Sequence, residues 1–334
     1  MNYGRLGAAA GGWACLAPAA ALTVARVTGR DEHRAFVAAQ SVTGSGFMLA
    51  AVAMGAAGMA RCRFLAAASA PVVAVNLRWV LSEVAPARPI PAAADGAPRL
   101  RLLSANLFTL NAQMDALAAE ILGADADVLL LQELSWANLP GLRRGGVVDA
   151  YPFQLLAPRA DAFGSAILSR LPLVDEEMWM AAQLPMARGT VLVGGRRVRV
   201  YCVHPRAPFG PRGLPRWRAQ MISVHQAVSS EPRPLVVAGD FNATWGHRRL
   251  RDLLGEGLRD AHVERGRGWV PTWPSDLRFL PPLARVDHVL VSPELAVLAA
   301  TEGRGPGSDH RPLIVDLALL NSPRPAPAAT PAPS

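Results

Sequence analysis

Polar side chains stand where several apolar runs of this sequence end. In chain order they are Asn106, Glu133, His204, Asp240, Asn242, Asp287, Asp309 and His310. Each one alone has an ordinary structural explanation, as a turn former, a solvated strand end or a hydrogen-bonded core histidine. Ligands gather where strand ends meet at one rim of an α/β sheet. The recurrence of such endings therefore favours a single functional site.

The side-chain types in this set suit one kind of chemistry. Hard oxygen ligands without paired cysteines favour Mg²⁺ or Mn²⁺ over zinc. His310 with a carboxylate partner can activate or orient a water molecule. A carboxamide and a second histidine can donate hydrogen bonds to charge that develops on phosphorus. The set therefore predicts metal-assisted hydrolysis of a phosphate ester.

Short apolar runs alternate with helical patterns between residues 99 and 320, and these elements must position the polar set. The runs predicted as strands are 100–107, 127–133, 165–170, 196–204, 234–240, 285–291 and 312–319. Residues 112–122 and 215–228 repeat apolar side chains at helical spacing. Strands interleaved with helices indicate an α/β architecture with buried sheets.

The N-terminal region carries three apolar stretches with almost no charge. We expect transmembrane helices over about 7–25, 38–60 and 64–82, because roughly 18 to 20 apolar residues span a bilayer. The alternatives are two spanning helices, a soluble helical domain or a cleaved signal peptide, and a second apolar stretch argues against the last. The predicted organisation is membrane helices over 1–83, a Pro/Ala-rich linker over 84–98, a catalytic domain over 99–320 and a disordered tail over 321–334.

Charge and cysteine content narrow the choice of partners. The formal net charge is +8, and all 34 basic residues are arginine, which suits phosphate through two-donor contacts. Such a charge permits nucleic acid, an anionic lipid surface or a phosphorylated substrate. The three cysteines, Cys15, Cys62 and Cys202, are scattered, so they indicate neither a disulfide framework nor a paired-cysteine metal site.

Six motifs occur in the order and at the spacings of the endonuclease/exonuclease/phosphatase superfamily, which this chain resembles. They are "SANL", "LLLQEL", "AILSRLPL", "GDFNA", "RVDHVLVS" and "GSDHRPL". Pancreatic-type deoxyribonucleases, abasic-site endonucleases, inositol polyphosphate phosphatases and neutral sphingomyelinases share the fold. The resemblance covers about residues 99–320 and implies a two-sheet β-sandwich flanked by helices, with metal-dependent hydrolysis of phosphate esters.

The resemblance also implies metal ligands. Glu133 matches the principal metal ligand of the family, and Asn106 lies beside it. Asp309 looks like a second-metal or metal-proximal carboxylate. The implied cofactor is Mg²⁺, or Mn²⁺ in its place.

The catalytic roles follow from the same resemblance. Asp240 matches the acidic residue that contacts the attacking water or a metal, and Asn242 the carboxamide that steadies the phosphoryl oxygens. Asp287 looks like the partner that orients His310, which acts as general base or as electrostatic stabiliser. His204 matches the position at which the family carries a side chain that donates a hydrogen bond to the phosphate.

Other histidines and arginines carry weaker signals. We interpret His288 as a packing residue, and we leave Arg206 and Arg212 open between a solvated loop and a contact to substrate phosphate. Three further histidines lie in helix or loop patterns without partners and are expected at the surface: His225, His247 and His262.

The N-terminal helices narrow the resemblance further. Together with "VHPRAP", "GDFNAT" and "TWP", they resemble a VanJ-like subgroup of membrane-anchored bacterial members. That subgroup implies a multi-pass protein of the cytoplasmic membrane, an extracytoplasmic catalytic domain and a lipid-linked phosphate or pyrophosphate of the cell envelope as substrate. The positive-inside count is a tie, with Arg5, Arg61 and Arg63 on one side and Arg26, Arg30 and Arg34 on the other, and it turns slightly against an outside domain when Arg88, Arg99 and Arg101 are added. A nuclease acting on DNA or RNA and a non-catalytic membrane scaffold are the rival functions.

Overall fold

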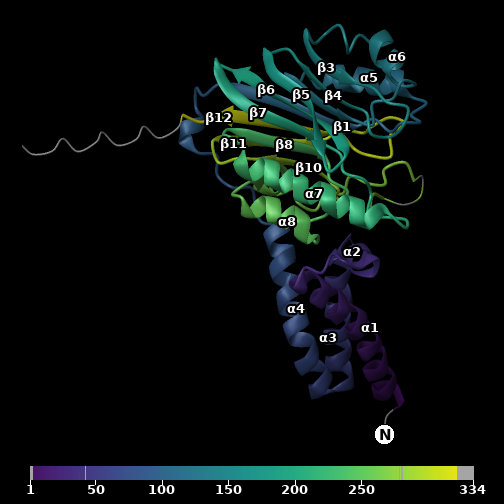
Figure 1. Cartoon of the computed structure of the whole chain (residues 1–334). Coiled ribbons are helices and arrows are strands. Elements are labelled where there is room, and N and C mark those ends of the chain that lie inside the picture. Colours follow the sequence, from purple (N-terminus) through teal and green to yellow (C-terminus); the bar gives the residue numbers. More distant parts are fainter. Residues whose placement is uncertain (1–2, 42, 278, 280, 322–334) are drawn as a thin grey trace, which may run out of the picture.

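The chain forms a two-sheet domain above a bundle of N-terminal helices (Figure 1). This computed structural model describes residues 3–41, 43–277, 279 and 281–321. The predicted α/β class and two-sheet sandwich are confirmed. Most of the tail that was predicted to be disordered, residues 322–334, lies outside the described part.

The first sheet has the strand order β11-β12-β1-β2-β4-β3. Its strands are β1 (Arg99–Asn106), β2 (Val128–Gln132), β3 (Phe153–Ala157), β4 (Ser165–Ser169), β11 (Leu295–Glu302) and β12 (Leu313–Leu319). β1 and β2 run parallel, whereas the other neighbours are antiparallel. The carboxyl ends of β1 and β2 therefore reach the same edge of this sheet.

The second sheet has the order β5-β6-β7-β8-β10-β9. Its strands are β5 (Leu173–Ala181), β6 (Leu184–Val193), β7 (Arg196–Val203), β8 (Leu235–Asp240), β9 (Arg259–Asp260) and β10 (Asp287–Val291). β7 and β8 form its parallel pair, and β10 runs antiparallel to β8. The start of β10 therefore meets the end of β8.

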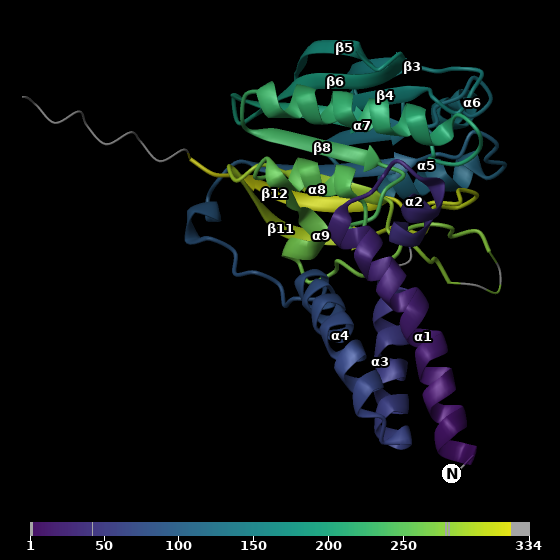
Figure 2. The ribbon, with the colours of Figure 1, turned by 60° about the horizontal axis from the view of Figure 1, so that its bottom comes forward.

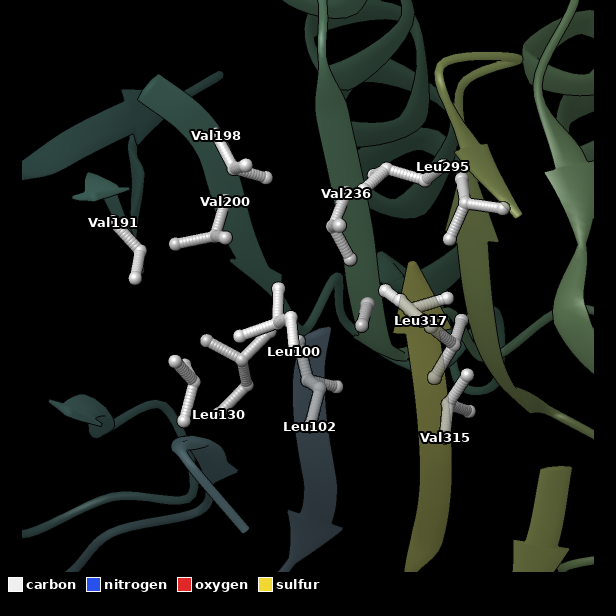
Figure 3. Close-up of a cluster of buried hydrophobic side chains, with 14 of the residues drawn as sticks. Leu100, Leu102, Leu130, Val191, Val198, Val200, Val236, Leu295, Val315 and Leu317 are labelled. Atoms are coloured by element: carbon white, nitrogen blue, oxygen red, sulfur yellow. The ribbon is translucent and has the colours of Figure 1, made fainter. Parts of the chain in front are cut away.

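The main core lies between the two sheets (Figure 3). Alternate residues of the strands point into it, since side chains alternate between the faces of a strand. Leu100 and Leu102 of β1 pack there with Val200 of β7 and Val236 of β8. Burial of each such side chain stabilises the fold by roughly 1.5–3 kcal/mol.

Helices cover the outer face of each sheet. On the first sheet these are α5 (Met114–Gly123) and α6 (Leu139–Arg144), and on the second they are α7 (Gly213–Ser230) and α8 (Arg248–Gly255). Trp217 of α7 is fully buried against the second sheet, next to Tyr201 and Val237. A short helix, α9 (Ala261–Glu264), follows β9.

The N-terminal bundle consists of α1 (Tyr3–Thr28), α3 (Thr43–Ala60) and α4 (Arg63–Glu83), which pack against one another, with the short α2 (Arg34–Ser41) at the domain end (Figure 2). α1 and α4 are each long and apolar enough to span a membrane. A third span requires α2 and α3 together, and these are bent by 79°. The helix predicted over 38–60 is thus divided, because Gly44 and Gly46 are poor helix formers near the bend.

The segment between the helical bundle and the two-sheet domain packs against that domain. Residues 84–98 contain a single 3₁₀ turn, Ala92–Ala94, and Ala94 is buried against Ala296 and Ala318. The Arg88 guanidinium lies 2.7 Å from the Glu264 carboxylate. Residues 84–98 therefore form a strap that contacts the domain at Arg88 and at Ala94.

Candidate active site

The ends of four strands and the start of a fifth meet at one rim of the sandwich. Asn106 is paired with Gln132 at the end of β1 and β2, and Asp240 with Asp287 across β8 and β10. His204 follows the last residue of β7. The parallel pairs place these residues together although they are far apart in the sequence, as expected for a ligand rim.

Side-chain alternation explains which residues face the site. Val236 and Ala238 point into the inter-sheet core, so Asp240 shares their face two residues further on. The same alternation sends His288 to the opposite face of β10, while Asp287 faces the site. In β8, the position between Ala238 and Asp240 must be glycine, since a Cβ atom on Gly239 would lie 2.0 Å from the Val203 carbonyl oxygen.

Glu133 breaks this alternation through its backbone. Strict alternation after Leu130 and Gln132 would put Glu133 on the helix-covered face of β2. Its φ of 56° is left-handed, which ends the strand and turns the carboxylate toward the rim. Glu133 Oε2 accepts hydrogen bonds from the amide and the hydroxyl of Thr109, both at 2.8 Å, and Oε1 accepts one from Asn106 at 3.1 Å.

The pKa of Glu133 is held below its usual value. Burial alone would raise this pKa, but the nearby His204 and the hydrogen bonds from Thr109 and Asn106 together outweigh burial. Glu133 is therefore a carboxylate at neutral pH, as a ligand of a divalent cation must be.

Asp240 Oδ2 is the point on which the other side chains converge. Donor nitrogens lie within 3.7 Å of it from four residues: Asn106 Nδ2 at 3.2 Å, Asn242 Nδ2 at 3.3 Å, His204 Nε2 at 3.5 Å and His310 Nε2 at 3.7 Å. Burial raises the pKa of Asp240 despite the opposing charge of His310, and the Asp287 carboxylate raises it further. Asp240 is therefore suited to accept a proton.

Asn242 directly supports Asp240. Its backbone amide donates to Asp240 Oδ1 at 2.8 Å, and its side chain also donates to the Pro205 carbonyl at 3.0 Å. The φ of Asn242 is 48°, a left-handed value that asparagine tolerates better than most residues. This tight turn explains why β8 stops at Asp240.

His310 is held by a buried carboxylate. Its Nδ1 lies 2.9 Å from Asp287 Oδ2, which leaves Nε2 facing Asp240. Burial lowers the pKa of His310, but Asp287, Asp240 and Asp309 more than compensate and raise it to about 10. The imidazole is thus positively charged at neutral pH and acts as a donor from both nitrogens.

Asp309 has one oxygen that accepts a hydrogen bond and one that does not. Oδ2 accepts a hydrogen bond from the Trp273 indole nitrogen at 3.0 Å, whereas the buried Oδ1 has no hydrogen-bond partner among the described residues. Burial raises the pKa of Asp309, and the charge of Glu133 raises it further. Oδ1 lies 3.9 Å from Nε2 of the charged His310 but makes no hydrogen bond, so it is free to accept a cation.

The donor set fits a hard divalent cation. Carboxylate oxygens of Asp240 and Asp287 lie within 4.8 Å of each other and of a ring nitrogen of His310, and the two carboxylates are the possible ligands there, because a charged imidazole has no free lone pair. Within the described part of the chain, no arginine forms an ion pair with Glu133, Asp240, Asp287 or Asp309. Asn106 presents its nitrogen to Glu133 and Asp240 and its oxygen to the Phe108 amide, so it positions both carboxylates, and its role as a metal ligand stays a prediction.

Two of the three histidines expected at the surface are buried, so that expectation is wrong for them. His247 precedes α8 and accepts the Thr244 amide at 2.9 Å through Nδ1, and His262 is enclosed beside Glu302. Burial lowers the pKa of both to about 4, so both are neutral. His247 is the residue before α8 and His262 lies in the four-residue α9, so helical periodicity does not report on either, and tertiary contacts bury both. His225 is half-buried and pairs with Glu256.

The structure also places His288 and Arg206. His288 bridges Asp260 Oδ2 at 2.8 Å and the Ala243 carbonyl at 2.9 Å on the outer face of β10, which agrees with a packing role. Arg206 stacks over the Phe163 ring at 4.0 Å, and that ring lies 5.6 Å from His204. Its guanidinium is therefore beside the rim.

Three supporting residues escaped the sequence prediction. Thr109 binds Glu133, and Trp273 binds Asp309. Ser308 Oγ donates to the Asn106 carbonyl at 2.7 Å and accepts the His310 amide at 3.1 Å, which ties the last motif to β1. Ser308 and Trp273 stand inside quoted motifs, but only the fold brings Thr109 to Glu133.

Comparison with known proteins agrees with this geometry. The sequence profile described as the Endonuclease/Exonuclease/phosphatase family matches residues 103–310. No curated protein matches the chain. Among solved structures, an endonuclease/exonuclease/phosphatase from Beutenbergia cavernae is similar with a TM-score of 0.52 and 19% identity, over 68% of this chain and 73% of that one.

Two further solved structures share the fold. Truncated TDP2 from Caenorhabditis elegans has a TM-score of 0.53 and 18% identity, over 66% of this chain and 97% of that one. An endonuclease/exonuclease/phosphatase family protein from Bacteroides thetaiotaomicron has a TM-score of 0.54 and 16% identity, over 67% of this chain and 98% of that one. Each alignment leaves about a third of this chain uncovered.

Proposed function

The chain belongs to the endonuclease/exonuclease/phosphatase family, and from this premise we propose that it cleaves a phosphoester or pyrophosphate bond of an envelope lipid-linked phosphate. Members of the family are metal-dependent hydrolases of phosphate esters, so the chain is an enzyme of that class. The finer proposal includes a VanJ-like, membrane-anchored role, an extracytoplasmic domain and Mg²⁺, or Mn²⁺, as cofactor.

The observation that supports the proposed chemistry best is the convergence of hydrogen-bond donors on Asp240. Donor groups of His204, His310 and two asparagines surround one small volume, as binding of a tetrahedral anion requires. Glu133 and Asp309 are the residues that would hold the cation, which when bound neutralises negative charge on the phosphate. In this scheme Asp240 takes the proton of the attacking water.

The histidines act on the charge that builds up during cleavage. Asp287 fixes His310 Nδ1, so Nε2 stays aimed at the reacting phosphoryl oxygens and stabilises their negative charge. His204 Nε2 lies between Asp240 and Glu133, at 3.5 and 3.9 Å, and donates from the second sheet. Both imidazoles are almost fully buried, which strengthens these interactions.

The position of the helical bundle supports the proposal of a lipid substrate, because the bundle packs against the domain beside the site. Thr244, two residues after Asn242, donates its hydroxyl to the Gln40 carbonyl at 2.9 Å. The buried Asp31, between α1 and α2, pairs with Arg249 of α8 and lies 3.3 Å from Arg218 of α7. The site is thus close to helices that are apolar enough to enter a bilayer.

A nuclease is the second candidate, and Arg206 favours it. Its guanidinium stacks on Phe163 next to His204, where a neighbouring phosphate of a nucleic acid would lie. Purified full-length protein with Mg²⁺ should release phosphate from a prenyl pyrophosphate and leave plasmid DNA intact. DNA cleavage without phosphate release would reverse this ranking.

Sidedness needs its own test. We expect a periplasm-dependent reporter fused after Asn321 to be active if the domain is extracytoplasmic. A fusion that works only as a cytoplasmic reporter would refute this orientation while leaving the chemistry untouched.

A further inference from the structure

A crevice of about 250 Å³ lies between the helical bundle and the catalytic domain. Apolar side chains from both parts line it: Met48, Trp269, Pro271, Leu283 and Ala284. Pockets that hold whole drug-sized ligands measure roughly 300–1,000 Å³, so this crevice suits a part of a larger molecule.

The mouth of the crevice exposes apolar side chains next to the membrane-type helices. Met48 of α3 is 68% exposed, Leu283 is 65% exposed and Trp269 is 46% exposed. Large apolar groups that gather at one exposed place mark an interaction surface. Met48 belongs to an apolar helix of the bundle, so a bilayer that took up these helices would bring hydrocarbon close to this mouth.

The crevice is also close to the active site along the backbone. Ala284 precedes Asp287 by three residues, and Thr244, another lining residue, follows Asn242 by two. A chain spans at most about 3.6 Å per residue, so the lining atoms of the backbone lie within about 11 Å of these site residues. A molecule with its phosphate at the site would reach the crevice once its chain extends over a distance of this order.

Hydrogen bonds connect the crevice wall to the catalytic carboxylates. The Leu283 amide donates to the Trp273 carbonyl at 2.9 Å, and the Trp273 indole donates to Asp309. The Thr272 hydroxyl accepts the amide of Asp287 at 3.4 Å. The wall and the site therefore form one continuous structure.

We propose that this crevice binds the hydrocarbon chain of the lipid phosphate whose head group reacts at Asp240. This inference rests on the proposed function and adds the route by which the substrate leaves the bilayer. The charged residues of the lining are engaged within the protein, Glu83 with Arg26 at 3.1 Å and Arg285 with Asp260 at 2.9 Å. The apolar side chains are therefore the recognition surface.

Two glycines of α3 provide a matched test. A Cβ atom at Gly44 would lie 3.8 Å from Trp269, in ordinary contact, so the Gly44→Phe side chain would fill the crevice. A Cβ atom at Gly55 meets no described atom within 4 Å, so Gly55→Phe is the control. Both full-length variants are assayed with a long-chain prenyl phosphate and with a short-chain phosphate ester.

We expect Gly44→Phe to lower the ratio of kcat/KM for the long-chain over the short-chain substrate by at least about tenfold, because displacement of even one methylene group has an effect of this order. Gly55→Phe should keep the wild-type ratio. An unchanged ratio in Gly44→Phe would overturn the crevice as a chain site.

Photolabelling separates this inference from the proposed function. Full-length Glu133→Ala protein is irradiated with a farnesyl phosphate analogue that carries a terminal diazirine, and the labelled peptides are identified. We expect labels on the peptides that contain Trp269 and Leu283. Such labels with no turnover of lipid phosphates by the wild type would uphold the crevice and refute the proposed function. Turnover with labels only elsewhere would refute the crevice alone.

Discussion

The pair formed by Asp287 and His310 gives the sharpest test of the mechanism. Asp287→Asn keeps the size of the side chain but removes the charge that lies 2.9 Å from His310 Nδ1. At an effective dielectric constant of 20, two unit charges at this separation interact by about 6 kcal/mol, which is an upper limit for the loss. Removal of the charge also takes away the largest contribution that raises the pKa of His310 to about 10.

We expect kcat to fall by roughly 10²–10⁴, since about 1.4 kcal/mol of lost transition-state stabilisation costs one factor of ten. KM should change little, because the interaction strengthens as charge develops on the phosphoryl group. The assay measures kcat and KM for phosphate release at neutral pH with saturating Mg²⁺. Circular dichroism of the same sample verifies that the variant is folded.

A second histidine–carboxylate pair of the same length serves as the control. His225 lies 2.9 Å from Glu256 on the helical face, outside the site. Glu256→Gln makes the same change of carboxylate to amide there and should leave kcat within a factor of two. If Asp287→Asn also stayed within about threefold of the wild type, the charged-pair mechanism would be refuted.

The remaining predictions concern metal, pH and core. Glu133→Ala should lower kcat by at least about 10³ and weaken Mg²⁺ or Mn²⁺ binding measured by calorimetry, and EDTA should abolish wild-type activity reversibly; retained metal affinity would contradict the assignment. Folding lowers the pKa of His262 from 6.5 to about 4, so on acidification this histidine is protonated in the unfolded chain at a higher pH than in the folded chain. The free energy of unfolding should therefore fall as the pH drops from about 6.5 to 4. In His262→Gln, the loss of Tm between pH 7 and pH 4.5 should be smaller, and an equal loss would count against this origin. Trp217→Ala should cost about 3–5 kcal/mol of unfolding free energy in denaturant titrations, whereas a cost under 1 kcal/mol would contradict its buried position.

Strand alternation made most of the site predictable. Asp240 and Asn106 follow apolar residues of the inter-sheet core at even spacing, so both could be expected at the rim with their side chains on one face. Glu133 has the wrong parity for this face and reaches the site only through its left-handed backbone. Its motif identified it, but periodicity alone would have misplaced it.

The strands and buried histidines that were not predicted have weaker local sequence patterns. β5 includes the sequence "LVDEEMWMA", whose charged residues hide a strand with one exposed face, and β11 carries too many alanines to stand out. Burial of His247 and His262 depends on contacts between short helices and distant elements, which no local window contains.

The docked strap and the paired Asp31 together fix the position of the catalytic rim relative to the N-terminal helices. Arg88 and Ala94 hold the strap to the domain, and Asp31 holds the domain to the helix ends. If the helices lie in a bilayer, as proposed, the rim is held at a constant distance from the membrane surface. Lipid phosphates presented at that distance would then be cleaved, whereas longer or shorter head groups would not reach the rim.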